Sequence, residues 1–131
     1  MAEYTCGLDE IDSGSIALAG GKGANLGELT AAGLPVPLAF CVNTQAYRQL
    51  IEANSLLEPI LKVLDGLNYD DPIEIDQRAK AIREMIIAAE IPQDIEAAIR
   101  TGYEQLESQL SENVMVSVRS SATAEDLPGT S

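Results

Sequence analysis

Residues 19–37 read AGGKGANLGELTAAGLPVP, and this stretch predicts where one helix begins and ends. Glycines surround Lys22, and apolar residues at a helical spacing follow them. Gly33 stands where a glycine commonly ends a helix, and Pro35 prevents the helix from continuing. The stretch therefore predicts a glycine turn, then a short helix over residues 24–32, and then a sharp stop.

Helices dominate the elements that we expect further along the chain. The segment LAFCVN (38–43) predicts a buried strand, and Thr44 is placed to cap the helix after it. The sequence DPIE (71–74) combines an N-cap, a first-turn proline and an acid, and an apolar stripe follows at helical spacing. Another helix is expected after Pro92, and VMVSV (114–118) predicts a second buried strand. The fold class expected is α+β, helix-rich with few strands.

Charge and composition exclude several classes of function. The 131 residues, about one domain, hold 21 acids and 8 bases, which gives a net charge of −13. Such a surface repels nucleic acid and anionic membranes, so neither is expected as a partner. No apolar run reaches the roughly 18 residues of a membrane span. The chain contains no histidine, so it cannot supply a histidine base or a phosphohistidine itself.

The two cysteines and the N-terminal sequence indicate a compartment. Cys6 and Cys41 lie far apart in the sequence, without a paired CxxC or a histidine nearby. We expect reduced, packed thiols rather than a metal site. The N-terminal residues show neither the positive charge nor the apolar run of a signal peptide. The expected location is the cytoplasm.

Two of the eight bases stand apart from the others. Six fall on predicted helices near acids, where surface ion pairs are the simplest interpretation: Arg48, Lys62, Arg78, Lys80, Arg83 and Arg100. Lys22 lies instead in AGGKGAN, and Arg119 lies in VRSSAT. Both occur at junctions between elements, among glycines or small hydroxyl residues.

These two contexts suit the binding of phosphate groups. Glycine lets backbone N–H groups approach an anion, and a helix N-terminus favours negative charge. Lysine supplies a mobile charge and arginine a planar fork for phosphate oxygens. The pattern is not a Walker A loop, because Gly23 rather than Ser or Thr follows Lys22. A plain glycine turn with a solvated lysine, and serines that cap a loop, remain the alternative.

A resemblance favours the phosphate interpretation. The segments GGKGANLGEL, GLPVPLAFCVNTQAY and VSVRSSATAEDLPGTS together resemble the N-terminal nucleotide-binding domain of phosphoenolpyruvate synthases. Pyruvate phosphate dikinases and rifampicin phosphotransferases belong to the same superfamily. The resemblance implies an ATP-grasp domain of which residues 1–131 form the N-terminal part. The rest of the ATP site, a phosphohistidine domain and an acceptor domain are then expected outside these residues.

The resemblance also implies roles for individual residues. Lys22 and Arg119 match the family's catalytic phosphate contacts. The expected ATP-binding set is Gly20, Gly21, Lys22, Gly23, Arg119, Ser120, Ser121 and Thr123. Glu125 and Asp126 match the motif, but we expect loop acids there rather than metal ligands. The Mg²⁺ ligands and the adenine pocket are expected beyond Ser131.

The implied reaction is a phosphoryl relay. ATP is split to AMP, and the phosphoryl group passes through a histidine of another domain to pyruvate. A rifampicin-phosphotransferase-type enzyme, with a drug hydroxyl as acceptor, is the first alternative. A standalone, non-catalytic interaction module is the second. Under either enzyme interpretation, the full-length parent protein is expected to be the phosphotransferase. The 131 residues alone are expected to be inactive.

Overall fold

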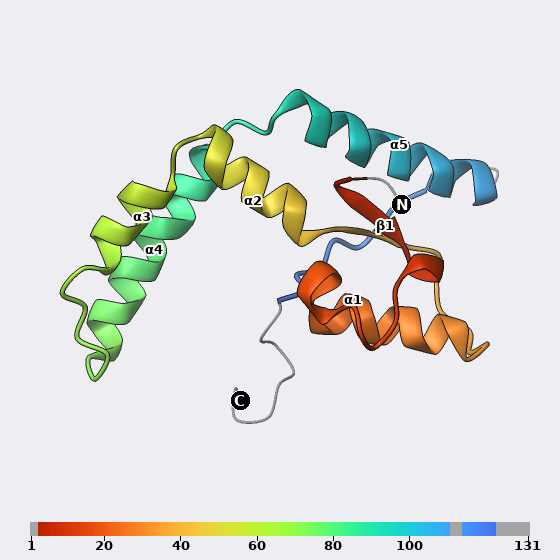
Figure 1. Ribbon diagram of the computed structural model, residues 1–131, viewed down its shortest axis with the longest axis horizontal. Coiled ribbons are helices and arrows are strands. Elements are labelled where there is room, and N and C mark those ends of the chain that lie inside the picture. Colours follow the sequence, from red (N-terminus) through yellow and green to blue (C-terminus); the bar gives the residue numbers. More distant parts are fainter. Residues whose placement is uncertain (1–2, 111–113, 123–131) are drawn as a thin grey trace. The chain divides into compact units, whose positions relative to one another are not determined.

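The computed structural model describes residues 3–110 and 114–122 (Figure 1). The chain divides into two compact units. The first consists of Met1–Ala46 with Gln93–Ser131, and the second of Tyr47–Pro92. Thr123 and the residues after it lie outside the described part.

The first unit contains the sheet and two long helices. Its elements are β1 (Thr5–Gly7), the 3-10 helix η1 (Leu8–Glu10), α1 (Ile16–Ala31), β2 (Phe40–Val42), the first turn of α2 (Thr44–Ala53) and α5 (Gln93–Leu110). β1 and β2 pair antiparallel, with Cys6 opposite Cys41. This architecture confirms the helix-rich α+β class with few strands.

Small apolar clusters hold these elements together. One cluster joins β1, η1 and α1, and its buried members are Cys6, Leu8, Ile11 and Ala19. The other joins the start of the chain to α2 and α5 through Tyr4, Ala46 and Ile95. Their buried members combine two alanines and a cysteine with larger side chains, namely one leucine, two isoleucines and one tyrosine, so each cluster consists of a few closely packed residues.

α1 differs from the predicted helix in its start and its continuity. It begins at Ile16 rather than at residue 24, and Gly20 interrupts it with non-helical backbone angles (φ 76°, ψ 170°). Glycine disfavours helix by about 1 kcal/mol relative to alanine, which is why the sequence predicted a turn here. Buried contacts of the glycines outweigh that preference, since Gly21, Gly23 and Gly27 are all buried.

The cap of α2 is Asn43 rather than Thr44. The Asn43 side-chain oxygen accepts hydrogen bonds from two first-turn N–H groups (3.0 and 3.2 Å). Its amide nitrogen donates to the Glu3 carbonyl at 2.9 Å. The Thr44 hydroxyl donates instead to the Ala17 carbonyl at 2.8 Å. Asn43 thus caps α2 and also ties it to the start of the chain.

The first strand prediction is confirmed only in part, and the second is wrong. β2 covers only Phe40–Val42, and the side chain of Val42 is exposed, so the segment is not a buried strand. Residues 114–118 form no strand, and Met115 and Val118 are 98% and 92% exposed. A strand needs a neighbour for its N–H and C=O groups, and within the described residues nothing pairs with this segment. Apolar composition alone did not reveal that.

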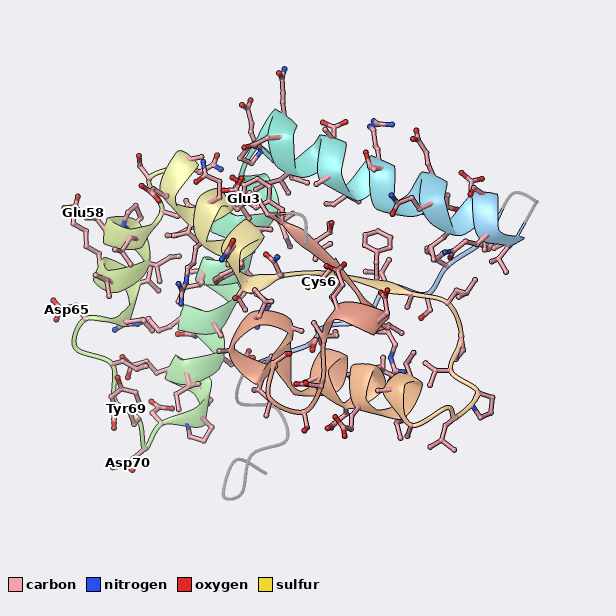
Figure 2. All side chains as sticks on the ribbon, turned by 45° about the vertical axis from the view of Figure 1, so that its right-hand side comes forward. Glu3, Cys6, Glu58, Asp65, Tyr69 and Asp70 are labelled. Carbon is pink, nitrogen blue, oxygen red and sulfur yellow. The ribbon has the colours of Figure 1, made fainter. Side chains whose placement is uncertain are left out.

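The second unit consists of the rest of α2 with α3 (Leu57–Leu64) and α4 (Pro72–Ala88). α3 and α4 lie side by side (Figure 1). The predicted start of α4 is confirmed, because the Asp71 side chain accepts hydrogen bonds from the N–H groups of Ile73 and Glu74. Tyr69, labelled in Figure 2, is exposed in the loop before it. None of residues 47–92 is buried. The apolar stripe predicted along α4 is therefore only partly covered by other residues.

Arg78 does more than form a surface ion pair. It pairs with Glu74 at 2.8 Å, as the helical spacing predicts. Its guanidinium also donates to the backbone carbonyls of Val63 and Asp65 at the end of α3. One side chain therefore joins α4 to carbonyls that lack helical partners. Arg100 shows the simple predicted behaviour, pairing with Glu96 on α5.

The Gly27→Ala variant tests the close packing of α1. A side chain at Gly27 would collide with the backbone carbonyl of Ile11. Helix propensity alone predicts a gain of about 1 kcal/mol for this change. We expect instead a loss of roughly 1–3 kcal/mol, because the collision forces the backbone apart. Urea denaturation measures it, and Asn25→Ala on the exposed face is the control. A raised midpoint for Gly27→Ala would contradict the packing.

Alkylation tests the cysteine environment. Both thiols are free, and Cys6 (Figure 2) is 1% exposed. Burial raises the pKa of the Cys6 thiol, with Cys41 and Glu10 adding to it, and burial also raises the pKa of Cys41. A raised pKa leaves less thiolate at pH 8, so iodoacetamide should react slowly, and with the half-buried Cys41 before Cys6. Both should react quickly in denaturant. Equal rates for Cys6 in the folded and denatured chain would overturn this.

Candidate functional site

Two segments that the sequence separates by about 100 residues meet at the kink of α1. We call residues 19–23 the glycine turn and residues 119–122 the serine loop. The N–H of Gly21 donates to the carbonyl of Ala122 at 2.9 Å. The Lys22 ammonium donates to the carbonyl of Ser120 at 3.1 Å. Figure 1 shows this end of the described chain beside the start of α1.

Ser121 makes the closest connection between the two segments. Its hydroxyl donates to the carbonyl of Ala19 at 2.7 Å and accepts from the N–H of Gly23 at 2.9 Å. Ala19 and Gly23 are four residues apart, so an uninterrupted helix would bond these two groups to each other. At the kink, the serine hydroxyl bonds to both of them. A side chain inserted into the helical ladder is one of the recognised causes of a kink.

Two glycines make this approach possible. A side chain on Gly20 would collide with the backbone of Ser121, and the φ of 76° is itself one that other residues rarely adopt. A Cβ on Gly23 would lie 3.0 Å from the Cys41 sulfur. The sequence had suggested that these glycines let an anion approach. In the structure, the segment that approaches them is the serine loop.

The two candidate cations lie at this junction. Lys22 is half-buried in the first turn after the kink, whereas the prediction placed it just before a helix. Arg119 is exposed, and no hydrogen bond or ion pair joins its side chain to another described residue. The contact from Lys22 to the Ser120 carbonyl brings the lysine to the residue next to Arg119. The Lys22 ammonium therefore lies close to the backbone next to Arg119.

Seven of the eight predicted ATP-binding residues lie in these two segments. The eighth, Thr123, lies outside the described residues, as do Glu125 and Asp126. The prediction missed Ala19 and Ala122, which take part through their carbonyl oxygens. Nothing in an alanine side chain signals such a role. The glycines around Lys22 are the sequence signal that another backbone segment approaches here.

The described part of the chain holds no group of three or more His, Cys, Asp or Glu side chains that could bind a metal ion. Among the helices that the structure describes, none combines the length and the apolar character required to cross a bilayer.

Comparison with known proteins places the chain in a family. Residues 16–131 match the family described as "Pyruvate phosphate dikinase, AMP/ATP-binding domain". A probable phosphoenolpyruvate synthase of Methanocaldococcus jannaschii is 45% identical over 127 residues, 96% of this chain and 11% of that protein. The phosphoenolpyruvate synthase of Aquifex aeolicus is 42% identical over 129 residues, 95% of this chain and 15% of that protein.

A relative with a different name matches at a similar identity. The rifampicin phosphotransferase of Bacillus subtilis is 41% identical over 129 residues, 98% of this chain and 14% of that protein. The chain thus spans between 11% and 15% of the length of these three relatives. Because the family match covers most of the chain, this chain belongs to the pyruvate phosphate dikinase AMP/ATP-binding domain family.

Proposed function

We propose that residues 1–131 form the N-terminal part of an ATP-grasp domain in a phosphoenolpyruvate synthase-like phosphotransferase. The family match and the synthase relatives support this assignment. The observation that carries it is the hydrogen bond from the Lys22 ammonium to the carbonyl of Ser120, the residue next to Arg119. The free thiols of Cys6 and Cys41 favour a reducing compartment, so we place the protein in the cytoplasm.

The proposed role of this site is to bind and neutralise the phosphates of ATP. Phosphoryl transfer needs positioning and charge stabilisation more than covalent help from the protein. Lys22 can follow a moving phosphoryl group with its flexible ammonium, and Arg119 can bind two oxygens with its planar fork. Mg²⁺ would neutralise further phosphate charge, but the described residues offer no fitting ligand cluster. We assign them phosphate contacts only.

The acceptor is proposed to be pyruvate, reached through a histidine in another part of the protein. Transfer to a drug hydroxyl is the second candidate, and the rifampicin phosphotransferase of Bacillus subtilis favours it. A non-catalytic interaction module is the third, since these 131 residues contain no histidine. Incubating the full-length protein with ATP and either pyruvate or rifampicin separates the three. AMP formation dependent on one acceptor identifies the enzyme, and none with either supports the module.

Substitution of the two cations tests the site. In the full-length protein, Lys22→Ala and Arg119→Ala should each lower ATP-dependent AMP formation at least ~100-fold, because a preorganised charge on the reacting group is lost. Lys62→Ala, an exposed base on α3, is the control and should leave the rate unchanged. Folding of all three is checked by circular dichroism. A near-normal rate in either site variant would refute the assignment.

Titration of the 131-residue chain with Mg-ATP tests how much of the site it contains. Two cations and a glycine turn attract a triphosphate, but adenine needs an apolar slot that we place in later residues. We expect a dissociation constant in the millimolar range or weaker, roughly −4 kcal/mol. NMR shifts should cluster at residues 20–23 and 119–122, and the chain alone should turn over no ATP. Micromolar affinity, or shifts confined to residues 47–92, would contradict the proposal.

A further inference from the structure

We propose that Ser121 is a positioning residue that docks the serine loop into the glycine turn. The amides of Gly21 and Gly23 then serve this docking, and the phosphates are left to the side chains of Lys22 and Arg119. The docking rests on the geometry alone. Its consequence for catalysis rests on the proposed function.

The amide donors next to the kink of α1 are already occupied. The segment of α1 after Gly20 begins with N–H groups that have no partner inside the helix, and such groups commonly bind anions. Here the N–H of Gly21 is taken by the Ala122 carbonyl, and the N–H of Gly23 by the Ser121 hydroxyl. Each N–H carries one hydrogen, so neither amide can also bind a phosphate while the loop is docked.

The two serines of the loop differ in their hydrogen bonds. A hydroxyl has one hydrogen to donate, and Ser121 donates it to the Ala19 carbonyl at 2.7 Å. It therefore has no donor left for a phosphate oxygen. Ser120 differs, because its side chain is exposed and its hydroxyl bonds to no other described residue. Only its carbonyl is engaged, by Lys22.

Docking of the serine loop also affects the position of Arg119. Three consecutive residues of the loop are each bonded to the glycine turn: Ser120, Ser121 and Ala122. Arg119 directly precedes them, and its side chain has no bond within the described chain that would orient it. The docked loop therefore fixes the backbone position from which the Arg119 side chain extends. Losing the central bond at Ser121 should loosen the loop and so release the backbone of Arg119 from its fixed position.

Amide hydrogen exchange on the 131-residue chain, measured by NMR without nucleotide, tests the docking. First-turn amides normally exchange fast, so slow exchange at Gly23 would come from the serine hydroxyl. Ser121→Ala should speed exchange at Gly23 about 10-fold or more, the effect of losing a hydrogen bond of about 1.4 kcal/mol. Ser120→Ala is the matched control and should leave Gly23 unchanged, and Ser121→Thr should retain much of the protection. Exchange at Gly23 as slow in Ser121→Ala as in the wild type would overturn the docking role.

A double-mutant cycle in the full-length protein tests the link to Arg119. Ser121→Ala alone should lower kcat for AMP formation about 10-fold through misplacement of the arginine. In an Arg119→Ala background the same change should cost less than about 2-fold, because residues that act as one unit are not additive. Ser117→Ala, an exposed serine upstream, should have no effect in either background. Equal losses in both backgrounds would mean that Ser121 acts on stability alone.

The two measurements separate the failure of this inference from failure of the proposed function. If the protein forms no AMP in any variant while Gly23 loses protection in Ser121→Ala, the docking stands and the phosphotransferase proposal falls. If Lys22→Ala abolishes activity while Ser121→Ala changes neither exchange at Gly23 nor kcat, the phosphotransferase proposal stands and the docking role falls.

Discussion

The missing side chain of Gly20 is the constraint on which the candidate site depends. Any Cβ there would occupy the space of the Ser121 backbone, and the positive φ would strain other residues. The same residue interrupts α1 and so separates the Ala19 carbonyl from the Gly23 amide. The serine hydroxyl bonds to both groups. One small residue thereby joins two segments that the sequence holds about 100 positions apart.

The sequence predicted helix starts that depend on local chemistry. Asp71 and Pro72 supply a cap and a fixed φ within the first turn, so the start of α4 needs no distant partner. The helix expected after Pro92 is also confirmed, as α5 begins at Gln93. The unusual contexts of Lys22 and Arg119 were also visible, because both residues lie at junctions between predicted elements, among glycines or small hydroxyl residues.

What the sequence did not reveal depends on contacts between distant residues. The buried glycines of α1 read as a turn, since their helical state follows from packing against Ile11 and the serine loop. Asn43 displaced Thr44 as the cap because its amide also reaches Glu3, forty residues away. Residues 114–118 have strand-like composition, yet strand formation requires a neighbour that composition cannot specify. The roles of Ala19 and Ala122 could not be predicted either, because these residues take part through backbone carbonyls, which every residue has.

The absence of buried side chains in the second unit has a consequence for local unfolding. Burial supplies most of the free energy that opposes opening, so residues 47–92 should open at lower cost than the clusters of the first unit. Local hydrogen bonds, such as those of Asp71 and Arg78, contribute to the free energy that opposes unfolding of this unit. The glycine turn and the serine loop both belong to the first unit. Sub-global opening of the helical unit can therefore occur while the hydrogen bonds that assemble the candidate site remain intact.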